Sequence, residues 1–215
     1  MFAVSLAYFF YTYLVGFDQP ARADSVTSAL LINGGMFGLF ALHHSVFARQ
    51  AVKDVIARVL PPGIERTLYV WVASGLFMGV CRHWQPLAGV VYWHTGTAAL
   101  LHAGVQLAGL IVMAVAVVRL DALELAGIHW GSAEPDGFTR RSIYGLVRHP
   151  IYSGWLLFVF GTPHLNATRL GFAVVSLAYV LVAMPWEERT LERIRGHKYR
   201  SYLERVRWRL VPGIY

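Results

Sequence analysis

The chain has 215 residues, of which 56% are hydrophobic and 14% are charged, and its formal net charge at pH 7 is +7. A soluble domain normally has about a quarter of its residues charged, so this composition excludes an ordinary soluble domain and predicts an all-α integral membrane protein. The lone cysteine, Cys81, excludes an internal disulfide. Beside long apolar segments, the excess of positive charge indicates contact with membrane lipids, and no nucleic-acid partner is expected.

Six apolar segments follow one another along the chain. A membrane-spanning helix needs roughly 20 mostly apolar residues, and the segments near this length are residues 1–17, 27–48, 67–81, 97–118, 151–167 and 170–186. We therefore expect a single membrane domain, a bundle of about six transmembrane helices. Five helices remain an alternative because the third and fifth segments are short. The pairs Gly34 with Gly38 and Gly75 with Gly79 are expected to let helix backbones approach closely.

The basic residues predict how these segments are oriented. If all six cross, every one of the 19 lysines and arginines except Arg22, Arg82 and Arg169 falls on the same side. Such an asymmetry is typical of the cytoplasmic side, whereas a five-helix bundle would place these residues on both sides. We therefore expect both termini to face the cytoplasm, in the inner (cytoplasmic) membrane of a bacterium.

The last segment of the chain has a different pattern. In EERTLERIRGHKYRSYLERVRWRLVPGIY, apolar residues recur at helical spacing and basic residues fill the gaps. This pattern predicts an amphipathic helix that lies in the membrane interface, with a break at Gly196. The alternative is a solvated anchor for the preceding helix.

The stretch LVRHPIYSGW, residues 146–155, places Arg148, His149 and Pro150 directly before the fifth apolar segment. Proline lacks a backbone N–H and has a fixed φ, so Pro150 is expected to begin a helix. A helix start offers unpaired N–H groups and the positive end of a dipole, which favour an anion. The alternative is that Arg148 reaches lipid headgroups and His149 caps the helix.

Two carboxylates, Glu187 and Glu188, end the sixth apolar segment on the same predicted side. Carboxylates near hydrocarbon are costly, and those that occur there are usually paired or functional. A short connection joins the fifth and sixth segments into a hairpin, which is expected to bring His149 and the glutamates together. A positive helix start beside two carboxylates suits a zwitterionic ligand with a carboxylate, an amine and hydroxyls, such as S-adenosylmethionine.

These residues also carry a resemblance to a known superfamily. LVRHPIYSG followed by EERTLERIRGHKYRSYLERVRWRLVP resembles the C-terminal signature of the isoprenylcysteine carboxyl methyltransferase and phospholipid methyltransferase superfamily: R-H-P-x-Y-x-G, then E-E, Y-x-x-Y and a basic stretch before proline. Upstream, LFALHHSVFARQAVKD, PPGIERTLYVWVASG, HWQPL and RLDALELAGI resemble its NnrU-like and methanethiol S-methyltransferase branch. The resemblance covers most of the chain from about residue 35 onward.

The resemblance implies a membrane-embedded methyltransferase that uses S-adenosylmethionine. Residues 146–215 would form the cofactor site and residues 1–145 the acceptor side, and the implied cofactor-binding residues are Leu146, Val147, Arg148, His149, Pro150, Tyr152, Gly154, Glu187, Glu188, Tyr199 and Tyr202. Arg205 and Arg207 are expected to help close this site from the C-terminal tail, and the alternative for these two arginines is binding of anionic lipid.

The acceptor is less well defined by the sequence. The favoured substrate is a small lipophilic thiol such as methanethiol, which would become a thioether. The alternatives are a lipid-like acceptor (an isoprenylcysteine carboxyl or a phospholipid amine), an NADPH-dependent membrane reductase, and a non-enzymatic NnrU-like membrane protein. The oligomeric state stays open.

Candidates for the acceptor side lie at the end of the second apolar segment. A thiol reacts as its thiolate, so a group that takes its proton is expected. His43 and His44 are candidate bases, and neighbours on a helix point about 100° apart, so one of them would face the bundle interior. Arg49 follows and could line the acceptor's entrance. The alternatives are backbone or headgroup contacts for the histidines and simple interface anchoring for Arg49. No metal site is expected, because no third ligand has a helical spacing with the histidines.

Overall fold

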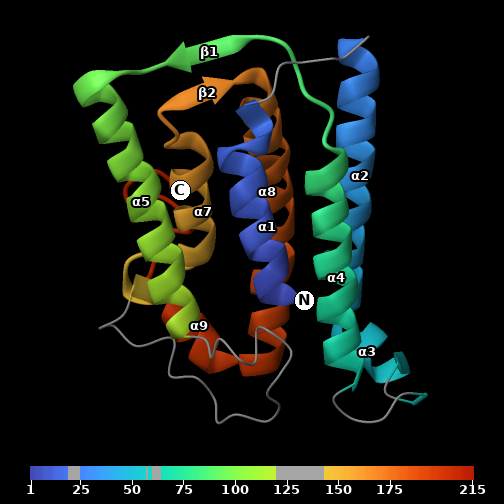
Figure 1. The fold of residues 1–215 in the computed structure, drawn as a ribbon. Helices are drawn as coiled ribbons and strands as arrows, with labels where there is room; N and C mark the ends of the chain where they lie inside the picture. The colour runs from blue at the N-terminus through green and yellow to red at the C-terminus, as the bar shows by residue number, and fades with distance from the viewer. Residues whose placement is uncertain (19–24, 57, 60–63, 120–142) are drawn as a thin grey trace. The chain divides into compact units, whose positions relative to one another are not determined.

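The computed structural model describes residues 1–18, 25–56, 58–59, 64–119 and 143–215 (Figure 1). Helices dominate this part of the chain, and the expected all-α membrane fold is confirmed. In chain order the elements are α1 (Phe2–Leu14), η1 (Gly16–Asp18), α2 (Val26–Phe47), α3 (Gln50–Ile56), α4 (Ile64–His83), β1 (Val90–Trp93), α5 (Gly96–Val118), η2 (Ile143–Gly145), α7 (Pro150–Phe160), β2 (His164–Asn166), α8 (Ala167–Arg195) and α9 (His197–Arg205). Arg22, Arg140, Arg141 and most of the RLDALELAGI stretch lie outside the described residues.

Each of the six apolar segments contains a helix, but the fifth, residues 151–167, is helical only to Phe160 and its last part includes the strand β2. By length and composition, α2, α5 and α8 can each cross a membrane, while α1 and α7 are shorter apolar helices. The 11 residues of α7 span about 16 Å, which is well short of a hydrocarbon core of ~30 Å. The helix of the third segment is longer than the predicted residues 67–81, because α4 has 20 residues. The number of crossings and their orientation stay predictions.

The sixth segment is also longer than expected. Helix α8 has 29 residues and continues through Glu187 and Glu188 to Arg195, so the two glutamates lie within a helix and not at its end. The predicted break at Gly196 is confirmed: this residue has φ of 55° and separates α8 from α9. The strands β1 and β2 pair in a two-stranded sheet.

The described residues form two compact units, and each is considered by itself. The first contains residues 1–91 and 166–175. Its core is aromatic: the fully buried ring of Phe172 lies 5.5 Å from that of Phe9 and 5.1 Å from that of Trp84. Arg169 donates to the carbonyls of Tyr13 and Leu14 and pairs with Asp18 at 2.8 Å. The guanidinium therefore satisfies carbonyls at the C-terminal end of α1, which a helix leaves unpaired.

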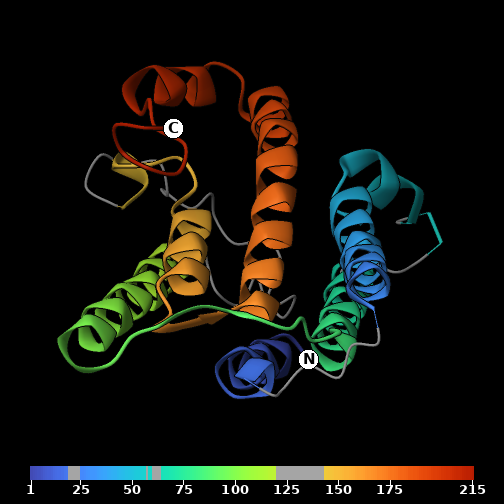
Figure 2. The same ribbon diagram turned by 90° about the horizontal axis from the view of Figure 1, so that it is seen from above.

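The predicted role of the small-residue pairs is wrong in this unit. A Cβ at Gly34, Gly38, Gly75 or Gly79 would meet no other atom of the described residues within 4 Å. Helices α2 and α4 lie side by side (Figure 1 and Figure 2), but large rings fill their contact, such as Phe40 and Phe77 at 5.1 Å. Glycine spacing permits a close approach without determining which faces of two helices meet.

The second unit contains α5, η2, α7, the rest of α8 and α9, and here glycines do bring backbones together. Helices α5 and α7 lie side by side in both views (Figure 1 and Figure 2). A Cβ on Gly109 would lie 2.6 Å from the carbonyl oxygen of Gly154, and one on Gly154 would lie 2.6 Å from that of Gly109. Any larger residue at either position would force the two helices apart.

After α9 the C-terminal tail, residues 206–215, runs back to the start of α7. The N–H groups of Arg148 and His149 donate to the carbonyls of Trp208 and Arg209 at 2.9 and 3.0 Å, and the Ser153 hydroxyl donates to the Leu210 carbonyl at 2.6 Å. Residues far apart in the sequence are thereby held beside the motif that begins α7.

Candidate functional site

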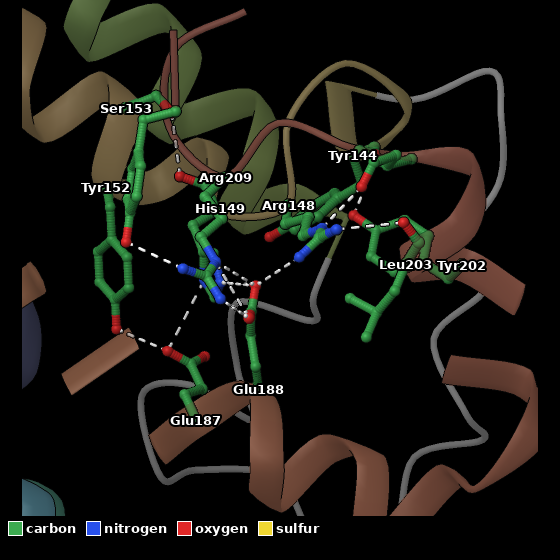
Figure 3. A network of polar contacts seen from close by, with 12 residues as sticks. Tyr144, Arg148, His149, Tyr152, Ser153, Glu187, Glu188, Tyr202, Leu203 and Arg209 are labelled. Carbon is green, nitrogen blue, oxygen red and sulfur yellow. Dashed lines mark hydrogen bonds and ion pairs between the residues drawn. The ribbon is translucent and has the colours of Figure 1, made fainter. Parts of the chain in front are cut away.

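Glu188 lies at the centre of a polar network (Figure 3). Its Oε1 accepts from Arg148 Nη1 at 3.2 Å and lies 3.3 Å from His149 Nε2, while its Oε2 accepts from Arg209 Nη2 at 2.9 Å. The side chain is 9% exposed, and a buried carboxylate is stable only when such partners surround it. Glu188 therefore joins the start of α7 to the C-terminal tail.

Arg148 uses its side chain to hold the tail. Its Nε donates to the Val206 carbonyl at 2.6 Å and its Nη2 to the Leu203 carbonyl at 3.1 Å, in addition to the bond with Glu188. These carbonyls lie at the C-terminal end of α9, where cations are favoured. The guanidinium is thus engaged by protein groups, and its predicted contact with a cofactor stays a prediction.

Glu187 has very different surroundings from its neighbour. Its side chain is 46% exposed, its Oε2 accepts from the Tyr152 hydroxyl at 2.9 Å, and the same oxygen lies 3.8 Å from His149 Nδ1. The rings of Tyr152 and His149 stack at 5.5 Å. Both nitrogens of the His149 ring therefore face carboxylates, one on Glu188 and one on Glu187 (Figure 3). Glu187 is the carboxylate that remains accessible to a ligand.

The start of α7 agrees with the sequence. The helix begins at Pro150, and His149 is its N-cap residue but makes no side-chain capping hydrogen bond. The expected meeting of His149 with the glutamate pair is observed. Gly154, in contrast, lies at the crossing with α5, which gives this member of the motif a packing function.

The two tyrosines of α9 are buried. Tyr199 and Tyr202 are 1% and 2% exposed, and the Tyr202 hydroxyl donates to the Tyr144 carbonyl at 2.8 Å. Burial raises the pKa values of Tyr144, Tyr199 and Tyr202, so each hydroxyl stays protonated at neutral pH. The structure gives both α9 tyrosines a packing function, and their contact with a cofactor stays a prediction.

An apolar cavity of about 670 Å³ adjoins the network. Leu146 and Val147, the two residues before Arg148, line it, together with residues of α5 and α7 and the tail residues Leu210, Val211 and Pro212. The cavity and the network are therefore built from the same three segments of the second unit: residues 146–149, helix α7 and the C-terminal tail.

The predicted acceptor-side residues belong to the first unit. His44 Nδ1 lies 3.0 Å from the Tyr69 hydroxyl, and the His43 ring stacks on Phe47 at 4.6 Å. His43 Nδ1 is buried without a hydrogen-bond partner in the described part of the chain. Arg49 is exposed at the end of this region. Sequence reasoning missed Tyr69, and the role of all three predicted residues stays a prediction.

Sequence reasoning also missed Arg209. Arg205 and Arg207 are exposed, whereas Arg209 binds Glu188 and donates from Nη1 to the Tyr215 hydroxyl at 2.9 Å. Burial alone would lower the pKa of Arg209, but its hydrogen bonds and the Glu188 charge raise it. The basic stretch before Pro212 indicated that an arginine of the tail could reach the site. It did not indicate which one, because the tail after α9 is not helical and no helical period distinguishes Arg209 from Arg205 and Arg207.

Comparison with known proteins shows similarity over most of the chain. It is 34% identical over 200 residues to the methanethiol S-methyltransferase of Crocosphaera subtropica, covering 89% of this chain and 78% of that protein. With the methanethiol S-methyltransferase of Mycobacterium tuberculosis the identity is 32% over 196 residues, covering 86% and 80%. Nurim of Xenopus laevis is 25% identical over 206 residues, covering 86% and 70%. No family model matches the chain, and no solved structure matches it significantly.

The contrast between the two glutamates predicts different effects on stability. Glu188→Gln removes the negative charge that Arg148 and Arg209 surround, so we expect it to lower the free energy of unfolding by about 3 kcal/mol. Glu187→Gln, at a half-exposed position, should cost less than about 1 kcal/mol. Thermal unfolding of both variants in detergent would measure this, and equal losses would contradict the assignment of Glu188 as the centre of the network.

Proposed function

Because the chain belongs to the methanethiol S-methyltransferase family, we propose that it is a membrane-embedded, S-adenosylmethionine-dependent enzyme that methylates a small thiol, methanethiol first, to a thioether. The observation that carries the proposal is the meeting of His149, at the start of α7, with the Glu187 and Glu188 carboxylates of α8. This arrangement offers a zwitterion the positive end of the α7 dipole and an accessible carboxylate, and an apolar cavity adjoins it.

The polar groups of the site fit S-adenosylmethionine. Its carboxylate suits the positive end of the α7 dipole, although the N–H groups of Arg148 and His149 already donate to the C-terminal tail and Pro150 has none. Its amine or ribose hydroxyls suit the accessible Glu187 carboxylate beside the Tyr152 hydroxyl. Leu146 and Val147 line the cavity and offer an apolar surface to the adenine. In this proposal Arg148, Glu188 and Arg209 keep the tail in place instead of touching the cofactor.

The residues of the chain supply orientation and exclusion of water. When bound, S-adenosylmethionine supplies a methyl group already activated for displacement by its sulfonium. The start of α7 and Glu187 would hold the donor in one orientation, which would favour an in-line approach by the acceptor sulfur. The walls of the cavity are mostly apolar and offer few groups that would hold a competing water beside the acceptor. The thiol must lose its proton to become the nucleophile, and His43 or His44 is the proposed base.

The proposed reaction can be tested directly with purified protein. With S-adenosylmethionine labelled in its methyl group, we expect labelled dimethyl sulfide to form from methanethiol in detergent or nanodiscs. Label found only on a lipid amine or a carboxyl group would contradict the thiol assignment. Binding of NADPH in the absence of any S-adenosylmethionine binding would contradict the methyltransferase assignment.

The role of Glu187 can be tested separately from the fold. Glu187→Gln should raise the KM for S-adenosylmethionine between about tenfold and a hundredfold, because a hydrogen bond to a charged group is worth about 1.5–3 kcal/mol. Glu192→Gln is the matched control, since Glu192 lies on the same helix, is 38% exposed and pairs with Arg200. An unchanged KM in Glu187→Gln would remove this residue from the cofactor site.

A base among the acceptor-side residues predicts a pH-dependent defect. We favour His43, since the His44 ring is already hydrogen bonded to Tyr69. His43→Gln should lower kcat/KM for methanethiol roughly a hundredfold at neutral pH. The loss should shrink as the pH rises and the thiol ionises by itself. A loss that is independent of pH, or one confined to His44→Gln, would contradict this role.

A further inference from the structure

The apolar cavity of the second unit runs along one face of two helices. It is lined on α5 by Ala98, Leu101, His102, Val105 and Val112, and on α7 by Ser153, Leu156, Leu157 and Phe160. These positions recur at the three- and four-residue spacing of a single helix face. From Ala98 to Val112 the lined face of α5 rises by about 21 Å, so the cavity is elongated.

One end of the cavity lies at the network and the other lies far from it. Leu146, Val147 and Leu210 are chain neighbours of Arg148 and Arg209 and line the near end. His94 and His102 line the far end, where their rings lie 4.6 Å apart. The Tyr92 ring packs on both at 4.6 and 5.1 Å. Its hydroxyl donates to the carbonyls of Phe160 and Thr162, which fixes this group of rings at the end of α7.

The volume of the cavity exceeds what a small thiol needs. A volume of about 670 Å³ falls in the range of pockets that bury ligands of drug size, roughly 300–1,000 Å³. Methanethiol has only two non-hydrogen atoms and would leave most of this space unfilled.

The chemistry of the walls indicates what can fill it. Among the lining residues only Ser153, His94 and His102 have polar side chains, and the Ser153 hydroxyl already donates to the Leu210 carbonyl. A charged cofactor placed along this length would leave polar groups unpaired, which is costly. A hydrocarbon chain buries apolar surface there at no such cost.

We infer that the cavity binds the hydrocarbon part of larger thiols, so that the enzyme methylates straight-chain alkanethiols of several carbons in addition to methanethiol. This inference rests on the proposed function. The S–H proton leaves to the base or to solvent, and the acceptor sulfur forms a bond to the methyl carbon. The bond between that carbon and the sulfonium breaks, and its electron pair stays on the departing sulfur, giving an alkyl methyl thioether and S-adenosylhomocysteine. The rings at the far end limit the chain length.

The test is a series of 1-alkanethiols from methanethiol to decanethiol with the full chain and S-adenosylmethionine. We expect kcat/KM to rise roughly fourfold for each added methylene that the cavity buries, and then to stop rising once the chain reaches the far end. Ala98→Trp, which fills the far end, should lower the ratio of octanethiol to methanethiol kcat/KM at least tenfold. Leu100→Trp is the matched control, because Leu100 lies on the same turn and does not line the cavity; it should leave the ratio unchanged.

The outcomes separate this inference from the proposed function. Methylation of methanethiol without any methylation of longer thiols would overturn the inference and leave the proposed function standing. No methylation of any thiol would overturn both. If Ala98→Trp and Leu100→Trp gave the same ratio as the unmodified protein, the long thiols would bind elsewhere, and the inference about the cavity would be overturned.

Discussion

A carboxylate placed near hydrocarbon must be surrounded by donors, and the arrangement of the second unit follows from how Glu188 meets that requirement. Its donors come from Arg148 and His149 at the start of α7 and from Arg209 in the tail. None of these is near it in sequence, so the chain has to fold back after α9. That return pairs residues 148–149 with 208–209 and places Leu210 to Pro212 against the cavity.

The neighbouring Glu187 points away from the arginines, because the side chains of adjacent helical residues point about 100° apart. Glu188 faces the arginines and is 9% exposed, whereas Glu187 faces Tyr152 and is 46% exposed. His149 lies between them, with one ring nitrogen toward each carboxylate (Figure 3). A ligand bound at Glu187 would therefore be coupled through His149 to the residues that hold the tail, so that fold and binding depend on the same imidazole.

Sequence reasoning found the parts of the site that depend on local chemistry. The fixed φ of Pro150 predicted the start of α7, the apolar segments predicted the helices, and the short connection predicted that His149 meets Glu187 and Glu188. It failed where the answer depends on which surfaces meet in three dimensions. The pairs at Gly34 and Gly75 have the right spacing, but the close approach occurs at Gly109 and Gly154. Likewise, the different burial of Glu187 and Glu188 is a property of the folded tail.

The shortness of α7 connects these features. If its first residue lies at the membrane surface, a helix of about 16 Å ends inside a hydrocarbon core of ~30 Å, where unpaired carbonyls are costly. Side chains of neighbouring elements satisfy them: Gln106 donates to the Phe158 carbonyl, and Tyr92 donates to those of Phe160 and Thr162. The groups that stabilise the end of α7 are thus adjacent to the far end of the cavity. Removing Tyr92 or Gln106 would leave carbonyls of α7 unpaired in hydrocarbon. The fold therefore requires the group of rings that ends the cavity, and the length of the cavity is not set by the acceptor alone.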